Sequence, residues 1–211
     1  MSLYTLFTAP NSYAMGAHVV LEEIGAPYDL RWVELFSDAP DPDFLSASPH
    51  ARVPALRGPE GTLFESGAIA MYLAERHPGA GLSIAPGHPL RGRYLQWMHY
   101  LAATLQPDAM LQFHPEAYFA DQTRQRALKE ASMQRLEKIL HVIDEALSPG
   151  PWFLGDKLTV IDICFAMQAV WPELYRGGIG EYPNIARMVA RLRDRQSVQK
   201  VLAMHTKPAA E

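Results

Sequence analysis

The sequence predicts an α/β domain followed by an all-α domain, and three observations lead to this prediction. Residues 1–79 alternate between short apolar runs and helical patterns. Residues 80–89 are rich in glycine and proline and contain no Asp, Glu, Lys or Arg, which is typical of a linker. Residues 90–211 show long helical patterns and no strand pattern. We therefore expect a first domain over residues 1–79, a linker over 80–89 and a helical domain over 90–211.

The first domain opens with a strand, a helix and a second strand. The apolar run Leu3–Phe7 suits a buried strand, and Thr8–Tyr13 ends it with Pro, Asn and Ser. A helical pattern starts at Ala14, and Gly25 supplies a stop for that helix. Tyr28–Val33 alternates as a second strand. We expect a parallel βαβ unit, because strands connected through a helix run parallel.

The rest of the first domain is predicted to be a short helix at most, then a hairpin and a helix. Residues 38–49 are rich in Asp, Pro and Ser. Val53–Leu56 and Thr62–Phe64 are two short strand patterns joined by a turn that contains Gly and Pro. Ser66 is then a natural N-cap for the helix that follows. The resulting order βαβαββα is that of a thioredoxin-like domain.

The hairpin and the helix start carry a pattern that suits the binding of an amino acid or peptide. A helix start attracts anions, so Ser66 could hold a ligand carboxylate while Glu65 pairs with an ammonium group. Pro54 cannot donate a backbone hydrogen bond, which suits an edge strand. With a cis Val53–Pro54 bond, the Val53 backbone could pair with an extended peptide. The alternative is a trans proline that ends an edge strand, with Ser66 serving only as a cap.

Composition narrows the classes of function. The chain has 211 residues, 48% of them hydrophobic, and a formal net charge of −4 with no run of Lys or Arg. Nucleic acids and anionic membranes are therefore disfavoured as partners, and a small molecule is favoured. No apolar run is long enough to span a bilayer, and we expect a cytoplasmic protein. The single Cys164 lies in an apolar helical stretch, and the eight histidines are scattered, so we expect a buried thiol and no metal site.

The second domain contains one further motif. Leu90–Phe113 and Gln122–Leu147 are long helical patterns. They are followed by Gly155–Leu158 (GDKL), after which Thr159 stands three residues before Asp162 at the start of an apolar helix. This Thr-x-x-Asp spacing predicts a variant of the capping box, although an ordinary helix start has the same spacing.

Val-Pro in a strand, Glu-Ser at a helix start and the later GDKL-Thr-x-x-Asp motif together resemble the cytosolic glutathione S-transferase family, in a bacterial, serine-class-like form. The resemblance covers nearly the whole chain. It implies a homodimer that uses glutathione as co-substrate and no metal. It also implies that Thr159 and Asp162 form a structural capping box, and that glutathione is bound by Arg52, Val53, Pro54, Glu65 and Ser66.

The family places the group that activates the glutathione thiol in the loop after the first strand. Ser12 is our choice for this catalytic role, with Tyr13, Asn11 and Thr8 as alternatives. Ser12 could instead only cap the first turn of the helix. The loop has no Cys, which disfavours the Cys-dependent reactions of other classes. Pro10–Asn11 is similar to bacterial members that reduce glutathione-linked disulfides, although two extra residues before Leu21 weaken that match.

The resemblance also implies a pocket for an electrophile on the first long helical segment of the second domain. Apolar residues at helical spacing could equally be core residues. Three functions remain open: a glutathione transferase, a glutathione-dependent disulfide reductase or peroxidase, and a non-catalytic binding protein with the same fold. The candidate pocket residues are Tyr94, Met98, Met110, Phe113 and Tyr118.

Overall fold

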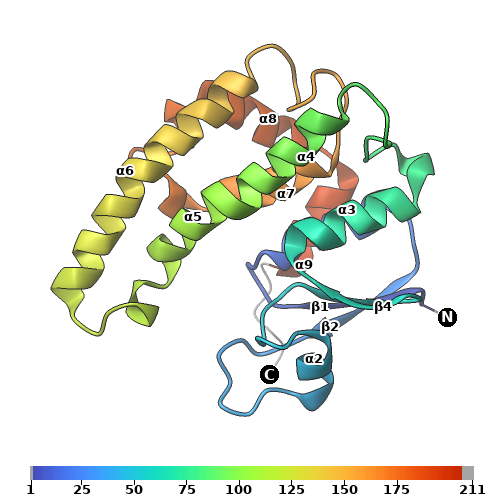
Figure 1. The fold of residues 1–211 in the computed structure, drawn as a ribbon, viewed down its shortest axis with the longest axis horizontal. Coiled ribbons are helices and arrows are strands. Elements are labelled where there is room, and N and C mark those ends of the chain that lie inside the picture. Colours follow the sequence, from blue (N-terminus) through green and yellow to red (C-terminus); the bar gives the residue numbers. More distant parts are fainter. Residues whose placement is uncertain (1, 206–211) are drawn as a thin grey trace. The chain divides into compact units, whose positions relative to one another are not determined.

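A computed structural model of the chain describes residues 2–205 and divides into two compact units (Figure 1). Of the described residues, the first unit contains 2–85 and 192–205, and the second contains Pro86–Arg191. The division after Ala85 falls within the predicted linker 80–89. The segment after Leu192, which the prediction assigned to the helical domain, groups with the first unit because its helix packs against the first helix of the chain.

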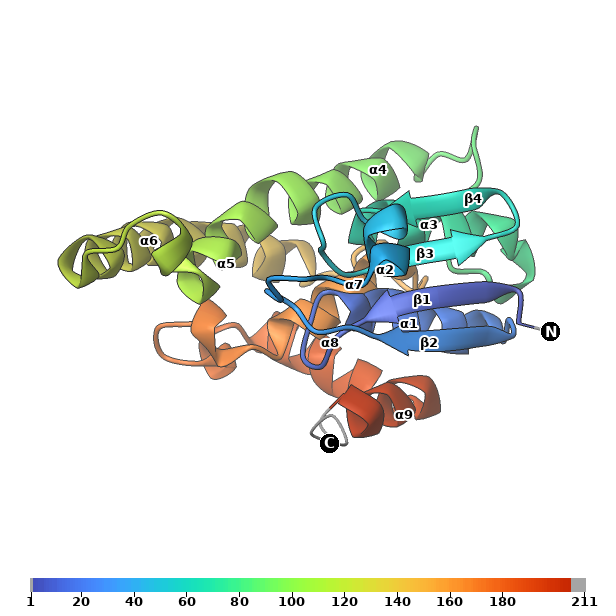
Figure 2. The ribbon, with the colours of Figure 1, turned by 90° about the horizontal axis from the view of Figure 1, so that it is seen from below.

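The first unit is built on a four-stranded mixed sheet in the order β2-β1-β3-β4 (Figure 2). Strand β1 pairs parallel to β2 and antiparallel to β3, and β3 pairs antiparallel to β4. The predicted βαβ unit and hairpin are therefore both present. The strands are β1 (Tyr4–Thr8), β2 (Tyr28–Trp32), β3 (Ala55–Gly58) and β4 (Gly61–Phe64).

Helices cover both faces of this sheet. Helices α1 (Ala14–Ile24) and α3 (Ser66–Arg76) pack together on one face, and the short helix α2 (Pro42–Ala47) lies on the other (Figure 2). Phe44 of α2 stacks on Phe7 of β1, with ring centroids 5.7 Å apart. Helix α1 ends where Gly25 adopts φ 66°, a left-handed conformation that costs glycine little.

The regular elements of the second unit are helices. Its helices are α4 (Arg91–Tyr100), α5 (Gln106–Phe113), α6 (Gln122–Ala146), α7 (Val160–Ala169) and α8 (Pro183–Arg193), the last of which crosses the boundary into the first unit. Helix α9 (Gln196–His205) belongs to the first unit. Short 3-10 turns cover Pro78–Ala80, Pro115–Ala117, Pro172–Leu174 and Ile179–Glu181.

The predicted helix Leu90–Phe113 is interrupted by a π-helical turn at Leu101–Leu105. Pro107, at the start of α5, has no N–H to donate to the preceding turn, and the Gln106 N–H reaches back to the carbonyl of Leu101. The predicted long helical segment is therefore present, with one π-helical turn inside it.

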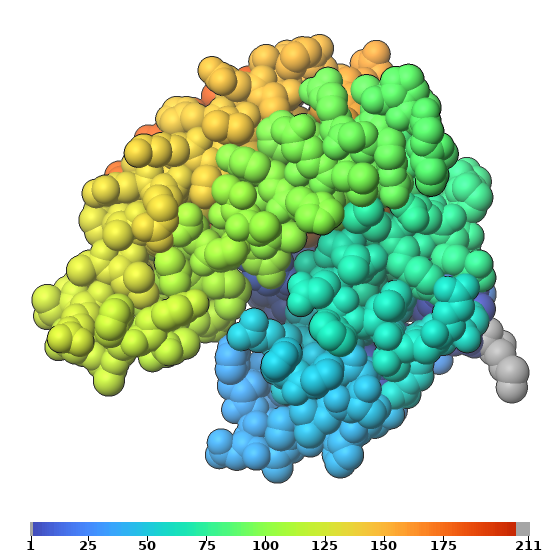
Figure 3. Space-filling model, viewed as in Figure 1, coloured from blue at the N-terminus to red at the C-terminus, as the bar shows by residue number. Residues whose placement is uncertain are grey.

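The core of the second unit lies around α7, all ten residues of which are buried. Helix α6 buries only one face, which includes Leu136, Leu140 and Ile143, and its other face forms the yellow to orange surface in Figure 3. Among residues 2–205, no helix combines the length and apolar character that crossing a bilayer requires. The predicted fold class, a thioredoxin-like α/β domain followed by an all-α domain, is confirmed.

Candidate functional site

Strand register brings three predicted site segments to one edge of the sheet. Phe7 of β1 pairs with Ala55 of β3, and Ala55 pairs with Phe64 of β4. The loop after β1, the residues before β3 and the residues after β4 therefore emerge side by side. We call these three segments, residues 9–13, 52–54 and 65–66, the strand-end site.

The Val53–Pro54 peptide bond is cis, and β3 starts only at Ala55. The strand predicted from Val53 was thus placed two residues too early. Within residues 2–205, neither backbone group of Val53 has a hydrogen-bond partner, and its side chain is half-buried. The Val53 backbone is therefore available to pair with a ligand.

Ser48 holds the chain in place just before Val53. Its hydroxyl accepts from the Arg52 N–H at 3.0 Å and donates to the Arg52 carbonyl at 2.8 Å. Ser48 is 1% exposed, whereas the Arg52 side chain is exposed. The sequence analysis did not identify Ser48 as a residue that supports the site. In the sequence, only its position directly after α2 sets it apart.

The start of α3 is open. Glu65 occupies the N-cap position at φ 74° and makes no side-chain capping bond, and Ser66 is the first helical residue. The prediction of Ser66 as N-cap was therefore wrong by one position. Because the first N–H groups of a helix have no intrahelical acceptor, this end of α3 can bind an anion. In the described part of the chain, the Glu65 and Ser66 side chains have no hydrogen-bond partner.

Ser12, the predicted activating residue, is 9% exposed and uses its hydroxyl within the loop. The hydroxyl donates to the carbonyl of Ala9 at 2.7 Å and accepts from the N–H of Ala14 at 3.3 Å. The Ala14 contact satisfies one of the unpaired donors at the start of α1. Ser12 thus has the capping role that the sequence left open as its alternative.

The other three loop candidates differ in exposure. Thr8 is fully buried, and burial raises the pKa of the Tyr13 phenol. Asn11 lies at φ 46° with an exposed side chain that makes no hydrogen bond within residues 2–205. Among the four candidates, Asn11 is the one that presents an exposed side-chain donor.

The predicted electrophile residues lie in the second unit in three different environments. Tyr94 and Met98 are buried in its core, at 0% and 3% exposure. Met110 and Phe113 are half-buried, and Phe113 packs edge-to-face on Trp171 at a centroid distance of 5.3 Å. Tyr118 is 57% exposed. The assignment of these five residues to an electrophile pocket stays a prediction.

Thr159 and Asp162 form a buried capping box at the start of α7. The Asp162 carboxylate accepts from the N–H groups of Phe153 and Thr159, both at 2.8 Å, and from the Thr159 hydroxyl at 3.1 Å. Burial nevertheless raises the pKa of Asp162 to about 6. Cys164, on the same helix, is buried, which raises the pKa of its thiol to about 12.

Comparisons with known proteins identify the family of this chain. Residues 2–75 match the glutathione S-transferase N-terminal domain family, and residues 107–196 match the C-terminal domain family. Glutathione S-transferase GstA of Escherichia coli O157:H7 is 28% identical over 202 residues, covering 94% of this chain and 96% of that protein. Disulfide-bond oxidoreductase YfcG of Escherichia coli K12 is 29% identical over 206 residues, covering 93% of each.

Two solved structures show the same fold. The ternary complex of BphK, a bacterial glutathione transferase, superposes with a TM-score of 0.86 at 27% identity, covering 96% of this chain and 100% of that one. A sphingomonad glutathione S-transferase in complex with glutathione superposes with a TM-score of 0.84 at 26% identity, covering 97% and 100%. Both of the family's domains therefore match in the expected order, and this chain belongs to the glutathione S-transferase family.

Proposed function

We propose that this chain binds glutathione at the strand-end site and activates its thiol for attack on a small electrophile. The observation that carries the proposal is the strand register, which brings an unpaired Val53 backbone beside an open start of α3 and the exposed amide of Asn11. The related sphingomonad enzyme was solved with glutathione bound, which supports the same ligand here.

The two ends of the tripeptide have matching groups at this site. The Glu65 carboxylate pairs with the ammonium of the γ-glutamyl residue, and the Ser66 hydroxyl with the first N–H groups of α3 holds its carboxylate. The Val53 backbone pairs with the cysteinyl residue as an added strand does, beside Pro54. The exposed guanidinium of Arg52 attracts a carboxylate of the ligand.

Thiol activation requires a donor that favours the thiolate, because a free thiol has a pKa near 8.5. Ser12, our choice from the sequence, already donates its proton to Ala9 and must give up that bond to reach sulfur. The Asn11 amide has no competing bond within residues 2–205. We therefore place Asn11 first and Ser12 second for this role.

A glutathione-dependent disulfide reductase is the second candidate function. It is favoured by the similarity to YfcG, a disulfide-bond oxidoreductase, and by the Pro10–Asn11 pair in the loop. In both functions the same residues bind glutathione and stabilise its thiolate. We also propose that the chain is a homodimer, which sedimentation at micromolar concentration tests by giving the mass of the monomer or its double.

The test compares Asn11→Ala and Ser12→Ala with Gln122→Ala, which removes an exposed amide at the start of α6. Calorimetry measures glutathione affinity, and ultraviolet absorbance measures the pKa of the bound thiol. We expect affinity within a few-fold of wild type in all three, with the thiol pKa raised by about one unit in Asn11→Ala, which is a tenfold loss of thiolate.

A larger rise in the thiol pKa for Ser12→Ala than for Asn11→Ala assigns the role to Ser12. Wild-type protein that fails to bind millimolar glutathione contradicts the proposal altogether. Turnover of a chloronitrobenzene identifies a transferase, and turnover of a mixed glutathione disulfide identifies a reductase.

A further inference from the structure

The turn between α2 and β3 is closed by a single residue, Ser48. The Ser48 N–H donates to the carbonyl of Phe44 at 2.8 Å, which ends helix α2. Its carbonyl accepts from the Ala51 N–H at 2.9 Å. Its hydroxyl accepts from the Arg52 N–H at 3.0 Å and donates to the Arg52 carbonyl at 2.8 Å. Every polar group of Ser48 thus has a partner, and the bonds beyond α2 all close the turn 48–52.

Helix α2, to which Ser48 is attached, is itself fixed to the sheet. The Arg57 guanidinium of β3 donates to the Asp43 carboxylate of α2, and the shortest contact between them is 2.7 Å. Phe44 of α2 lies in one buried cluster with Phe7 of β1. The first residue of the turn is therefore anchored to the sheet through the helix before it.

The turn holds one residue in an unfavourable conformation. Ala51 adopts φ 50°, a left-handed value that is uncommon for residues other than glycine, and its side chain, like that of Val53, packs against the buried cluster under α2. Of the four non-glycine residues within 2–205 that have positive φ, two others, Asn11 and Glu65, belong to the strand-end site. Because such residues cluster at functional sites, the turn has the character of a part of this site.

The bond from Ser48 to the Arg52 carbonyl also sets the direction of the Val53 N–H. These two backbone groups belong to one planar trans peptide unit, in which the carbonyl and the N–H point in opposite directions. The Val53 N–H therefore points away from Ser48, and it has no hydrogen-bond partner among residues 2–205. A ligand that pairs with this N–H meets a backbone that is already oriented, so less conformational entropy is lost on binding.

We propose that Ser48 is a positioning residue for glutathione, because its hydroxyl fixes the peptide unit whose N–H pairs with the ligand. The effect on the ligand rests on the proposed function, whereas the effect on the turn does not. Ser48 acts on the backbone at Val53 and not on the loop 9–13, which carries the candidate donors to the thiol. Its loss should therefore weaken glutathione binding and leave thiol activation unchanged.

The structural test is amide hydrogen exchange in Ser48→Ala without any ligand. The Ala51 N–H bonds to the Ser48 carbonyl, which alanine retains, so its exchange reports on the turn and not on the loss of its own acceptor. We expect this amide to exchange about tenfold faster relative to the Leu56 amide of the interior strand β3, which corrects for global stability. A ratio equal to that of the wild type overturns the proposal.

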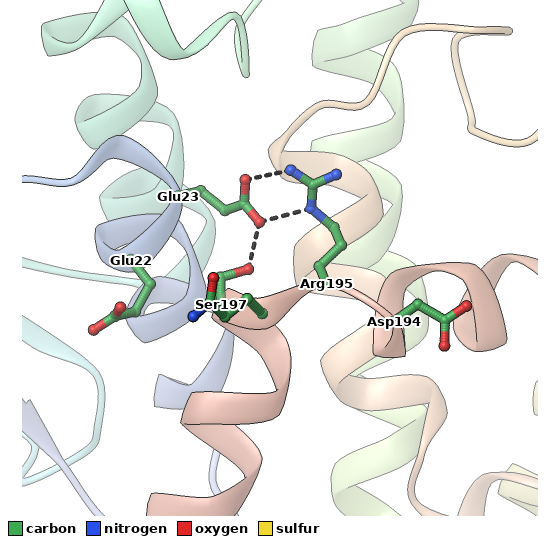
Figure 4. A pocket seen from close by; sticks show the side chains of 6 residues that line it. Glu22, Glu23, Asp194, Arg195 and Ser197 are labelled. Atoms are coloured by element: carbon green, nitrogen blue, oxygen red, sulfur yellow. Dashed lines mark hydrogen bonds and ion pairs between the residues drawn. The ribbon is translucent and has the colours of Figure 1, made fainter.

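Ser197→Ala is the matched control, because it removes a hydroxyl from the same unit. The Ser197 hydroxyl donates to the Glu23 carboxylate, which also accepts from the Arg195 guanidinium at 2.7 and 2.6 Å (Figure 4). Glu23 lies in the last turn of α1, at the end away from the loop 9–13. Both the Ala51 exchange ratio and glutathione affinity should stay at their wild-type values. Changes as large as those in Ser48→Ala would show a general loss of rigidity and overturn the proposal.

The functional test measures glutathione affinity by calorimetry and the pKa of the bound thiol by ultraviolet absorbance. In Ser48→Ala we expect affinity about tenfold weaker and KM for glutathione about tenfold higher, with kcat within about twofold and the thiol pKa unchanged. Ser48→Thr keeps the hydroxyl at a residue whose backbone is extended, with φ −136° and ψ 98°, as β-branched residues prefer. It should restore affinity to within about threefold of wild type.

A modified ligand tests whether the effect passes through Val53. Glutathione with a methyl group on its cysteinyl nitrogen cannot pair with the Val53 backbone as an added strand does. We expect the methyl group to weaken binding about tenfold in the wild type but only about threefold in Ser48→Ala, because the two changes act on one contact. Equal factors in the two proteins would place the effect of Ser48 elsewhere and overturn the proposed route.

Ser48→Cys serves if Ser48→Ala folds poorly, since the thiol fills the same space and forms weaker hydrogen bonds. It should change the exchange ratio and the affinity in the same directions, by about threefold. Wild-type affinity in a variant whose Ala51 amide exchanges faster overturns the effect on the ligand, and so does an affinity loss accompanied by a raised thiol pKa. A wild type that binds no glutathione contradicts the proposed function instead, and the exchange ratio then still decides whether Ser48 fixes the turn.

Discussion

Helices α3 and α7 each have one hydroxyl and one carboxylate side chain at their start. These side chains cap the first turn of α7 but not that of α3. At α7 the carboxylate of Asp162 satisfies three donors, and Thr159 and Asp162 are both fully buried. At α3 the carboxylate of Glu65 is exposed and caps nothing. The start of α7 is completed by the chain itself, whereas the start of α3 has no side-chain cap among the described residues and, in the function proposed above, binds the ligand.

The difference shows that a hydroxyl and a carboxylate at a helix start do not indicate function until burial and hydrogen bonding are known. Asp162 is the third helical residue and can reach back to Thr159, whereas Glu65 precedes the helix at φ 74° and cannot. Non-glycine residues at such φ values cost of order 1–3 kcal/mol, and they cluster at functional sites.

The largest effect is expected from Asp162→Ala. Removing this carboxylate leaves the Phe153 and Thr159 N–H groups buried without an acceptor, which should lower the free energy of unfolding by about 4 kcal/mol. Urea denaturation measures the change. Asp121→Ala, which removes the exposed N-cap of α6, is the matched control and should cost only about 1 kcal/mol. Equal losses in the two variants would remove the distinction between a buried and an exposed cap.

The next effect separates binding from stability at α3. Glu65→Ala should weaken glutathione binding by about 2 kcal/mol, the loss typical of a charge-assisted contact, as measured by calorimetry. Glu65→Gly should lose the same affinity but raise the free energy of unfolding by about 1 kcal/mol, because glycine adopts φ 74° without strain. Glu34→Ala, an exposed carboxylate of the same unit, should change neither quantity. Wild-type affinity in Glu65→Ala would falsify the proposed ammonium contact.

Most of the fold could be predicted because it depends on local patterns. Leu3–Phe7 is an apolar run and Tyr28–Val33 alternates between apolar and polar residues, and both patterns are typical of strands. The hairpin is marked by Gly and Pro in its turn. The start of β3 was misplaced because a single residue changes the backbone: the cis bond before Pro54 delays the strand to Ala55. The resemblance supplied the family, which the comparisons confirmed.

The site was harder to predict because its contacts depend on tertiary structure. Nothing in the loop sequence shows that the Ser12 proton belongs to Ala9, since that bond depends on the backbone path between them. Elsewhere in the first unit, the buried contact between His18 of α1 and His205 of α9 spans 187 positions and has no spacing that a pattern could detect. The resemblance, by contrast, assigned the loop, Val53 and Glu65 to one glutathione site; this assignment stays a prediction, and the strand register brings the three segments to one edge of the sheet.

Acid titration should also separate the two regions, because their pKa shifts have opposite signs. Burial lowers the pKa of His18 and His205 to about 4, so their contribution to stability is complete above pH 6.5 and is lost as the pH falls toward 4. Asp162 binds its proton more tightly when folded, so its contribution increases as the pH falls through about 6. Between pH 6.5 and 5.5 each histidine should remove about 1 kcal/mol, and Asp162 should restore roughly two thirds of that amount.

Wild-type protein should therefore lose about 1 kcal/mol over this pH interval, and Asp162→Asn, which cannot titrate, about 2 kcal/mol. Denaturation at the two pH values measures both losses. His205→Gln should reduce the loss relative to the wild type. Equal losses in the wild type and in Asp162→Asn would mean that Asp162 stays ionised at pH 5.5 in the folded protein.

The smallest effect is expected at Cys164, which tests whether α7 is purely structural. Its thiol is buried, and its pKa is raised to about 12, so almost no thiolate exists at neutral pH. Native protein should therefore react slowly with a thiol reagent and rapidly once unfolded in urea. Cys164→Ala should retain wild-type turnover and lose about 1 kcal/mol of stability, because it removes one buried sulfur. If a thiol reagent abolished turnover quickly, and glutathione protected against it while Cys164→Ala was insensitive, α7 would belong to the active site and the contrast with α3 would fail.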